Sequence, residues 1–568
     1  MIPREFPGLQ AAKAHPPHIV VIGFGPVAAR LVDGLLPAVR SGRLAVTVVG
    51  DELHAAYNRV LIADLGVGRT AVEDIALADT AELEAAGVVL QLGCCVRRVD
   101  RARRLVHLSD GRDLRYDRLV FATGSRPVVP NLRGLNADPQ RPACLPAGVI
   151  TLRDLKDAAA LHRAVLGGRR VVVLGGGILG LEAALAAAEE GARVTVVHHG
   201  AHALGRSIDA DAGRVLSAAL RECGVTVASD ARSTAVVLGP AAATAPDAAA
   251  VPAGATADRA RRPEAPPADT TTGPSKSAAA ERSFSALELD DGGRISGDLL
   301  VLSCGVRPRT EVAAGCGLRT DRGILVNHAL QAHHDPHVFA IGDCAEVHCL
   351  DANCPQCRDS AGPLGMIGPG WRQAEWLAAI LVRPETPAPP LPAERAPVML
   401  LKARGVDVAA AGNVDAGPFD AVPGGAGGVH PGGGGAPLRV AVWADPDHGK
   451  YVKMATRGGV LEGFVCVGMP RAAAELVLLF ERRAELPADR SALLVLDSAG
   501  PAAAAPSDPS RTVCRCAGVD QQTIAGAILD GCGTVSDVSA QTRAGTGCGG
   551  CHGDVRALIE QHFQAAPA

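Results

Sequence analysis

Two pairs of cysteines near the C-terminus have a spacing that is typical of metal binding. One residue separates Cys514 from Cys516, two residues separate Cys548 from Cys551, and residues 517–547 lie between the pairs. Four thiolates in two close pairs can hold either a tetrahedral zinc ion or an iron–sulfur cluster. The first pair is closer than the two to four intervening residues usual for structural zinc. The spacing predicts a metal centre and leaves both metals open.

A second thiol-rich segment contains His348, Cys349, Cys354 and Cys357. Three thiols and an imidazole have the composition of a zinc site, but the same residues could form a plain thiol-rich loop. The other nine of the 16 cysteines are isolated or adjacent, and we expect them to be structural. They are Cys94, Cys95, Cys144, Cys223, Cys304, Cys316, Cys344, Cys466 and Cys532.

A glycine turn near the N-terminus has the pattern of a dinucleotide-binding site. Gly23, Gly25 and Ala28 follow the apolar run HIVVI and open an Ala-rich segment. The glycines allow a tight turn and a close approach of backbone N–H groups to a pyrophosphate, which a helix N-terminus favours. Asp51 or Glu52 ends the next apolar run, where a carboxylate would accept a hydrogen bond from a ribose hydroxyl.

A second glycine turn repeats this plan with all three glycines. These are Gly175, Gly177 and Gly180. The strand predicted after the turn ends in Val197-His198-His199 and lacks the acidic residue that a free ribose would select. His198, together with His199 and Arg206, could tolerate a 2′-phosphate or stay neutral beside NADH, or the histidines could be solvated loop residues. The choice between NADH and NADPH stays open.

The elements that must position these residues are two βαβ units, each of which starts a doubly wound parallel sheet. Two further strand ends carry small or acidic residues suited to a cofactor. Thr123 and Gly124 follow the apolar run RLVFA, and Asp343 follows HVFAIG. The predicted fold class is α/β with two Rossmann-like dinucleotide-binding domains, an α+β C-terminal region and a small helical cysteine-rich domain.

Shifts in composition divide the chain. The predicted domains are 17–148 with 300–375, 149–299, 395–498 and 511–563. Residues 240–280, rich in Ala, Pro, Thr and Ser, are too poor in large apolar residues to fold, so we expect a disordered insertion within the second domain. Residues 416–437 form a predicted Gly-rich loop, and residues 499–510 form a predicted interdomain linker.

Composition argues against several kinds of partner. The formal net charge is −4 and aromatic residues make up 3% of the chain, so we expect no nucleic-acid partner. Met1–His18 lacks the apolar segment of a secretory signal, and the apolar stretch Val171–Ala188 carries Glu182 and several glycines. We therefore expect no membrane partner and a cytoplasmic location, where thiols remain reduced.

The order of motifs resembles the two-dinucleotide flavoprotein reductases. The shared order is GxGxxA, ATGSRP, GxGxxG with the following Glu182, CGVRP at 304–308 and AIGD. This resemblance implies FAD in the first domain, with Asp343 on the flavin side chain. It implies NAD(P)H in the second domain, with Glu182 near the nicotinamide. The stretch YNRVLI at 57–62 has no cysteine pair, which disfavours the disulfide-reducing branch.

The cysteine-rich tail resembles the bacterioferritin-associated ferredoxin domain, most clearly in TRAGTGCGGC. That resemblance implies a [2Fe–2S] cluster whose ligands are Cys514, Cys516, Cys548 and Cys551. Most of the chain is also similar to the NAD(P)H nitrite reductase large subunit and the electron-transfer subunit of assimilatory nitrate reductase. The segments that carry this similarity are YNRVLIADL, GWRQAEWLA, PVMLLKARGVDVAAAG and KYVKMATRGGVLEGFVCVGMP.

This similarity implies that Arg59 of YNRVLIADL contacts a cofactor. The chain departs from this similarity in three ways. Ala63 stands where the relatives usually have Ser, and the insertion at 240–280 is not shared. The given sequence ends at Ala568, without the sirohaem and [4Fe–4S] module that follows in the nitrite reductase large subunit. We therefore expect that this polypeptide does not reduce nitrite by itself.

The predicted function is electron transfer from NAD(P)H through FAD and a [2Fe–2S] cluster to a separate catalytic nitrate reductase chain. The alternatives are a ferredoxin or rubredoxin reductase, or a donor to a separate nitrite reductase chain. Two readings of other classes are a binding module that docks on an iron-storage partner and a zinc-stabilised regulatory flavoprotein. Hydride transfer between cofactors needs no protein acid or base, so we predict no catalytic side chain. The oligomeric state is left open.

Overall fold

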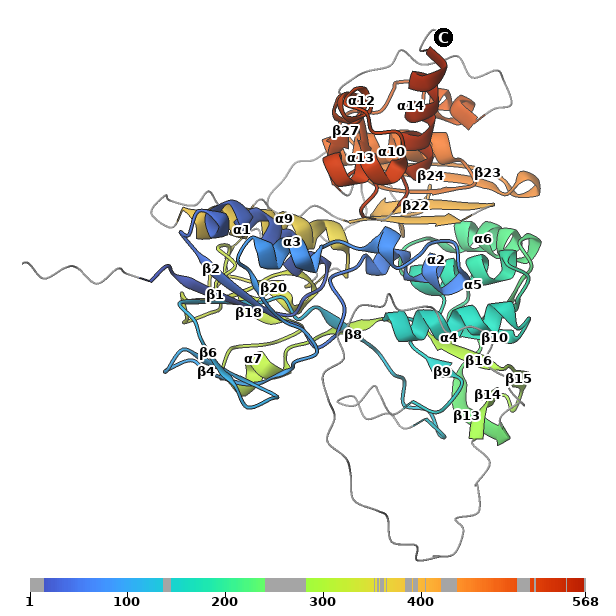
Figure 1. The fold of residues 1–568 in the computed structure, drawn as a ribbon. Helices are drawn as coiled ribbons and strands as arrows, with labels where there is room; N and C mark the ends of the chain where they lie inside the picture. Colours follow the sequence, from blue (N-terminus) through green and yellow to red (C-terminus); the bar gives the residue numbers. More distant parts are fainter. Residues whose placement is uncertain are drawn as a thin grey trace, which may run out of the picture.

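The architecture was obtained from a computed structural model (Figure 1). It describes residues 15–135, 145–240, 282–351, 353, 354, 357, 362, 363, 365–383, 391, 397–403, 405–419, 437–497, 511–514, 517–547 and 549–565. The predicted insertion and the predicted linker therefore lie outside the described residues, apart from Pro240. Of the predicted Gly-rich loop, residues 420–436 also lie outside them.

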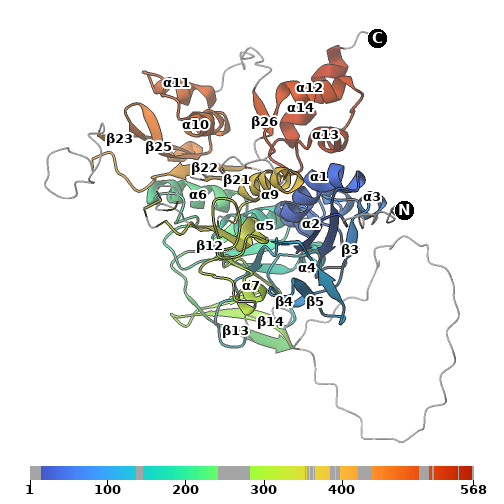
Figure 2. The same cartoon turned by 90° about the vertical axis from the view of Figure 1, so that its left-hand side faces the viewer.

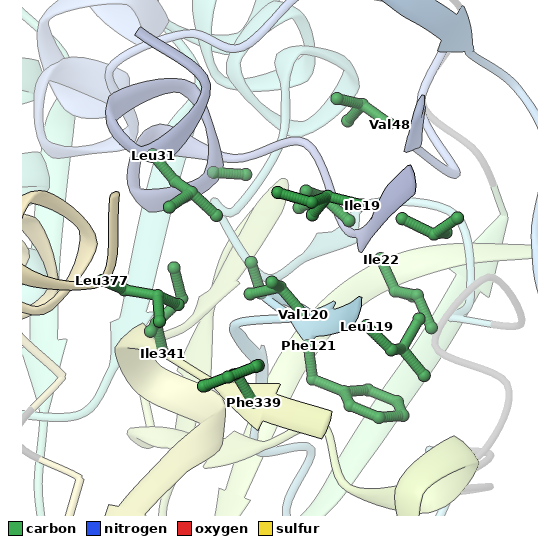
Figure 3. Packing of buried hydrophobic residues seen from close by; sticks show 14 of the residues in the cluster. Ile19, Ile22, Leu31, Val48, Leu119, Val120, Phe121, Phe339, Ile341 and Leu377 are labelled. Atoms are coloured by element: carbon green, nitrogen blue, oxygen red, sulfur yellow. The ribbon is translucent and has the colours of Figure 1, made fainter. Parts of the chain in front are cut away.

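The first domain is built on a five-stranded parallel sheet with the order β19-β7-β1-β2-β3. The strands are β1 (His18–Ile22), β2 (Ala45–Val49), β3 (Val89–Gln91), β7 (Arg118–Phe121) and β19 (Val338–Ala340). The central strands β1 and β7 are Val-, Ile- and Leu-rich because helices or other strands cover both faces of a parallel sheet. Figure 3 shows Ile19 of β1 and Val120 of β7 in one buried cluster with Leu31, Ile341 and Leu377.

Helices and a small antiparallel sheet cover this first sheet. The helices are α1 (Pro26–Arg40), α3 (Thr80–Ala85), α7 (Glu311–Gly315) and α9 (Ile367–Val382). The antiparallel strands are β4 (Val96–Asp100), β5 (Leu105–Leu108) and β6 (Asp113–Arg115), and β18 (Ile324–Val326) pairs separately with β20 (Ala345–Val347). Helix α9 packs along α1, so a segment more than 300 residues away in the chain completes the first domain.

The second domain repeats the plan with the sheet order β12-β11-β10-β16-β9, again all parallel. Its strands are β9 (Val149–Ile150), β10 (Arg170–Leu174), β11 (Arg193–Val197), β12 (Val225–Ala228) and β16 (Leu299–Leu302). Its helices are α4 (Leu155–Leu166), α5 (Ile178–Glu189) and α6 (Ala210–Glu222). The predicted boundary between residues 299 and 300 therefore falls inside β16, which pairs with β10 through its whole length.

A three-stranded antiparallel sheet joins β13 (Ser233–Pro240), β14 (Arg282–Leu289) and β15 (Arg294–Ser296). Pro240 lies opposite Arg282 in this sheet. The segment 241–281, which is not described, thus connects two neighbouring strands.

Two segments cross from the first domain to the second. β8 (Ser125–Pro127) pairs with β17 (Val306–Pro308). The turn η1 (Arg59–Leu61) leads into α2 (Ile62–Val67), whose buried residues pack against the core of the second domain between α4 and α5. Ala63 is buried in this contact, so it is a packing residue here.

The C-terminal region is an antiparallel sheet with the order β21-β22-β25-β24-β23. The strands are β21 (Val398–Ala403), β22 (Val406–Gly412), β23 (Leu438–Asp445), β24 (Lys450–Arg457) and β25 (Val460–Val467). Helices α10 (Pro470–Arg482) and α11 (Ser491–Leu494) pack on one face, and α5 and α6 of the second domain meet the other.

The cysteine-rich domain has its own small core. It contains β26 (Thr512–Cys514), β27 (Val519–Asp520), α12 (Gln521–Leu529), α13 (Val535–Thr542) and α14 (His552–Ala565). Figures 1 and 2 place these helices beside the C-terminal sheet, over the α1 side of the first domain. The predicted fold class is confirmed. Within the described residues, no helix combines the length and apolar character that crossing a membrane requires.

Candidate cofactor sites

The first glycine turn joins β1 to α1, and its two glycines lie in different surroundings. Gly23 has φ +103°, and a Cβ there would lie 2.3 Å from the carbonyl oxygen of Ala122. Gly25 is the N-cap of α1, and a Cβ there would meet nothing within 4 Å. No side chain caps this helix in the described structure, and its first turn has no acidic residue. The exposed N–H groups can therefore receive an anion such as a pyrophosphate.

Beside this turn, a cavity of about 170 Å³ opens at the carboxyl ends of β1 and β2. Gly23, Asp51, Thr123 and Arg309 are among the residues that line it. The Arg309 guanidinium donates to Asp51 across 3.0 Å, and the Thr123 hydroxyl donates to the Arg309 carbonyl across 2.8 Å. Asp51 therefore faces the cavity, whereas Glu52 turns towards the second domain. This geometry favours Asp51 over Glu52 as the acceptor for a ribose.

Two cysteines that we expected to be purely structural, Cys94 and Cys95, also line this cavity. Cys94 is buried and Cys95 is exposed. The other described members of that group are buried or half-buried, while Cys144 lies outside the described residues.

A run of polar side chains continues from Glu52 along the boundary between the two domains. Glu52 accepts from the Tyr57 hydroxyl across 2.8 Å and forms an ion pair with Arg59. The Arg59 guanidinium lies 4.7 Å from the Tyr57 ring centre and donates to the Arg153 carbonyl across 3.0 Å. Burial is the main reason that the pKa of Tyr57 lies above its usual range, so this phenol stays protonated. Arg59 is thus held in place by contacts from both domains.

The run ends at Asp343, three residues after β19. Its carboxylate accepts from the Ser125 hydroxyl across 2.7 Å and lies 3.9 Å from the Arg153 guanidinium. Asp343 is part-exposed rather than buried, which leaves it accessible to a ligand. Gly124, which precedes Ser125, has φ +65° and open space around its missing side chain.

Arg153 has an unusual environment that no sequence motif predicted. Its terminal nitrogen donates to the Ser125 hydroxyl across 2.8 Å, but its Nε is buried and has no acceptor in the described structure. Burial lowers the pKa of Arg153, and the nearby Asp343 opposes this shift. The preceding Leu152 has φ +50°, a strained conformation for a branched side chain. A buried donor without a partner, next to strained backbone, fits a site completed by a bound cofactor.

The second glycine turn joins β10 to α5, and the surroundings of its glycines differ in the same way. Gly175 has φ +124°, and a Cβ there would lie 2.1 Å from the Ser303 carbonyl oxygen. Gly177 is the uncapped N-cap of α5, with nothing within 4 Å of a Cβ. A Cβ on Gly180 would lie 2.7 Å from the Gly175 carbonyl oxygen, so its absence permits close packing of helix on strand. Glu182 lies two residues after Gly180 on α5 and is partly exposed.

His198 lies under this turn rather than in a solvated loop. It is buried, and a Cβ on Gly176 would lie 3.2 Å from its ring. Its Nε2 is 3.2 Å from the Ser229 hydroxyl, and burial is the main cause of its lowered pKa. A neutral, buried imidazole carries no charge to offer a 2′-phosphate, so of the alternatives left open for His198 its position disfavours phosphate contact and a solvated loop. His199 and Arg206 are exposed and remain candidates.

The cysteine-rich domain buries the two predicted metal ligands that the structure describes. Cys514 is at the end of β26 and Cys551 immediately precedes α14, and both belong to one core. The Gly545 N–H donates to the Cys514 sulfur across 3.5 Å, the type of hydrogen bond that tunes iron–sulfur clusters. Cys516 and Cys548 lie outside the described residues. The two buried thiols and the N–H donor fit a cluster.

The loop that precedes Cys551 contacts the first domain directly. The Asn58 amide donates to the Thr546 carbonyl across 2.7 Å and also to the Gly547 carbonyl. Arg543, at the end of α13, pairs with Asp33 of α1 across 2.9 Å. Asn58 is next to Arg59, so the cysteine loop adjoins the polar run between the two dinucleotide-binding domains. Sequence motifs carried no signal for this contact.

Comparison with known proteins places this architecture. The family model described as pyridine nucleotide-disulphide oxidoreductase matches residues 17–244 and 269–362. This chain belongs to that family. A model described as the BFD-like [2Fe-2S] binding domain matches residues 512–561. The predicted family is confirmed. The chain is an oxidoreductase whose domains are of the types that bind FAD, NAD(P)H and a [2Fe–2S] cluster.

Two curated relatives come from Bacillus subtilis (strain 168). The chain is 27% identical to a "Nitrite reductase [NAD(P)H]" over 96% of its own length and 57% of the relative's. It is 26% identical to an "Assimilatory nitrate reductase electron transfer subunit" over 95% of its own length and 59% of the relative's. The chain therefore spans less than two thirds of either relative.

A solved complex shows the same fold. The structure of the covalent putidaredoxin reductase–putidaredoxin complex aligns with a TM-score of 0.63, at 22% identity, over 84% of this chain and 95% of that chain.

Proposed function

We propose that this chain oxidises NAD(P)H and passes the electrons, through FAD and its own [2Fe–2S] domain, to a separate terminal reductase. The proposed acceptor is the catalytic chain of an assimilatory nitrate reductase. The similarity over nearly the whole of this chain to a protein named as an electron-transfer subunit supports that acceptor. A cytoplasmic location, where free thiols are maintained, is part of the proposal.

The observation that carries the proposal is the contact between the cysteine loop and the first domain. Asn58 binds two consecutive carbonyls of the loop between Cys514 and Cys551, and its neighbour Arg59 belongs to the polar run at the domain boundary. A domain used only to dock a partner would not need its metal-binding loop against the cofactor-binding half of the molecule. This placement supports electron exit through the cysteine-rich domain.

The residues of this chain bind and orient the cofactors. We assign the α1 N-terminus with Gly23, Gly25 and Ala28 to the FAD pyrophosphate, and Asp51 to its ribose. Asp343, Thr123, Gly124 and Arg59 would hold the rest of FAD, with Arg153 as an added donor. When bound, FAD exchanges two electrons with a nicotinamide and single electrons with an iron–sulfur centre.

The second domain would bind NAD(P)H in the same way. Gly175, Gly177 and Gly180 leave the α5 N-terminus open to its pyrophosphate, and Glu182 lies one turn along the same helix. The buried His198 ring packs against Gly176 of this turn. Cys514, Cys516, Cys548 and Cys551 would hold the cluster.

An anaerobic titration with NADH or NADPH tests the proposed path, with absorbance reporting the flavin and EPR reporting the cluster. We expect bleaching of the flavin and the signal of a reduced [2Fe–2S] cluster. The Cys514→Ser variant should keep flavin reduction and lose electron delivery to the nitrate reductase chain. Cys532→Ser is the matched control, because Cys532 is buried in the same domain, belongs to neither cysteine pair and donates to Gln541. Normal delivery by Cys514→Ser would overturn the proposed path.

The acceptor is tested separately with purified catalytic chains. We expect NAD(P)H-dependent reduction of nitrate when the nitrate reductase chain is added. Equal or faster turnover with a nitrite reductase chain, a ferredoxin or a rubredoxin would replace this acceptor and leave the internal electron path in place.

A further inference from the structure

The thiol-rich segment after β20 assembles a compact set of four ligand atoms. His328, Cys349, Cys354 and Cys357 each place one nitrogen or sulfur within 4.8 Å of all the others. Cys357 is buried, and the other three side chains are half-buried. His348, which the sequence placed in this group, is exposed and stays outside it. His328 takes its place from 21 residues before Cys349.

Three of the six distances within the set are close to those between the ligands of a single tetrahedral ion, and the others are at most 4.8 Å. The sulfurs of Cys349 and Cys357 are 3.6 Å apart, and the His328 Nε2 lies 3.3 Å from Cys354 and 3.5 Å from Cys357. Zn–S bonds of about 2.3 Å and Zn–N bonds of about 2.0 Å at tetrahedral angles require an S···S distance of about 3.8 Å and an S···N distance of about 3.5 Å. The observed separations are within about 0.3 Å of these values.

Two neighbouring parallel strands bring the ligands together. β18 pairs with β20, so Val326 lies opposite Val347 and both strands end at the same edge. His328 follows the first strand and Cys349 follows the second. The His348 N–H donates to the Val326 carbonyl across 2.8 Å, and His333 Nε2 donates to the His348 carbonyl across 2.6 Å. These bonds fix the loop through its backbone and leave the His348 ring free to point away.

Simpler explanations account for less of this arrangement. A disulfide joins only two thiols at about 2.05 Å, so it would leave the third cysteine and His328 unexplained. A thiol–imidazole hydrogen bond explains one pair at a time. Three thiolates and an imidazole that converge on one point are characteristic of a closed Cys₃His zinc site without an open coordination position.

We propose that His328, Cys349, Cys354 and Cys357 bind a structural Zn²⁺ ion. The ion ties the segment that follows β20 to the loop that follows β18. This segment leads towards α9, whose Gln373 accepts from the Gly342 N–H across 2.8 Å, next to Asp343. The zinc site would therefore hold the chain between the Asp343 turn and the helix that packs on it. It is separate from the predicted cluster ligands in the C-terminal domain.

Metal analysis of the purified full chain tests the proposal. We expect about one zinc per chain besides the iron of the cluster, and a zinc X-ray absorption spectrum fitted by three sulfurs at about 2.3 Å and one nitrogen at about 2.0 Å. His328→Ala and Cys349→Ser/Cys354→Ser should each lower zinc by tenfold or more. His348→Asn is the matched histidine control and Cys316→Ser the matched cysteine control; both should keep the zinc.

Zinc bound in place of the iron–sulfur cluster is distinguished by the Cys514→Ser/Cys551→Ser variant, which should retain the proposed zinc. If the site variants fail to fold, thiol modification of the wild-type chain still gives an answer, because it should release zinc in step with loss of the site thiols. Zinc retained in the site variants, iron found at this site, or a Cys349–Cys357 disulfide in the native chain would each overturn the proposal.

Discussion

At the residue scale, Gly23 and Gly25 separate the folding of the glycine turn from its binding role. A side chain on Gly23 would both require φ +103° and collide with the Ala122 backbone, and neither strain can relax without moving β7. A side chain on Gly25 would point into open space at the helix N-terminus. One glycine is needed for the turn to exist, and the other for a ligand to approach it.

We therefore expect Gly25→Ala to fold with a wild-type melting temperature as the apoprotein and to bind FAD at least tenfold more weakly. Gly23→Ala should lose about 1–3 kcal/mol of stability or more, because strained backbone and a backbone clash add. Differential scanning fluorimetry with and without added FAD measures both effects. Equal FAD affinity in Gly25→Ala and the wild type would contradict the assignment of the FAD pyrophosphate to this turn.

His198 makes a prediction about pH. The pKa of His198 is lowered in the folded chain. Below about pH 6.5 this imidazole is therefore protonated in the unfolded chain and still neutral in the folded chain. The stability that His198 contributes is therefore present at pH 7.5 and is lost as the pH falls through about 6.5. Each pH unit over which this difference persists costs about 1.4 kcal/mol.

A His198→Gln variant keeps a hydrogen-bonding side chain and cannot titrate. Its melting temperature should fall less steeply than that of the wild type between pH 7.5 and pH 5.5. His199→Gln is the control, since that side chain is exposed. Parallel pH profiles for His198→Gln and the wild type would contradict a buried neutral imidazole.

At the element scale, Asp209 couples a helix of the second domain to the C-terminal sheet. It caps α6 by accepting from the Ala212 N–H across 2.9 Å, and it also accepts from Tyr451 and Lys453 of β24, each across 2.8 Å. Burial alone would raise its pKa, but the hydrogen bonds from Lys453, Ala212 and Tyr451 hold that pKa below the usual value. Lys453 is itself buried and donates to the Val414 carbonyl.

Asp209→Ala should therefore lower the free energy of unfolding by more than the loss of a helix cap alone would. A cap is worth about 1 kcal/mol, whereas leaving a buried lysine without its carboxylate costs about 3–5 kcal/mol. The matched control is Asp154→Ala, because Asp154 caps α4 without a buried lysine beside it. Thermal unfolding of both variants measures the difference, and equal losses would show that the contact between α6 and β24 contributes little.

At the scale of the whole molecule, the contact between the cysteine loop and the first domain rests more on Asn58 than on charge. The Arg543–Asp33 pair is partly exposed, and pairs of that kind contribute about 0–1 kcal/mol. Asn58 is buried, and its amide satisfies two loop carbonyls, while its Oδ1 accepts from the Val60 N–H across 3.0 Å. Removing the donor from one buried and one half-buried acceptor costs about 1–3 kcal/mol.

Asn58→Asp isolates this contact. The new carboxylate keeps the bond from Val60 but presents an acceptor to two carbonyl oxygens, so the docked loop should be disfavoured. We expect NADH to reduce the flavin at an unchanged rate and the cluster to be reduced about tenfold more slowly, or slower still. A tenfold change in rate corresponds to a free-energy difference of about 1.4 kcal/mol. Stopped-flow absorbance after mixing with NADH resolves the two phases.

Asn413→Asp provides the control, because it makes the same change in an exposed turn of the C-terminal region. Unchanged cluster reduction in Asn58→Asp would mean that the docked arrangement is not the one that transfers electrons.

Much of this protein was predictable from local sequence because its determinants are short-range. Apolar runs of five residues, glycines that need positive φ and closely spaced cysteines act over a few residues, so the two glycine turns, their strands and the cysteine-rich domain follow from pattern.

The tertiary structure decided which distant residues meet. His328 replaces His348 because β18 pairs with β20, Asp51 faces the cavity because Arg309 reaches it across the first domain, and His198 is buried because a glycine turn lies over it. Arg153 belongs to no motif, and the shared segment YNRVLIADL gives no sign of the contact that Asn58 makes, since each residue acts through partners brought close by the packing of separate domains. Local sequence determines turns and ligand spacing through backbone geometry, whereas contacts across the molecule depend on sheet pairing and domain packing, which no short stretch of sequence encodes.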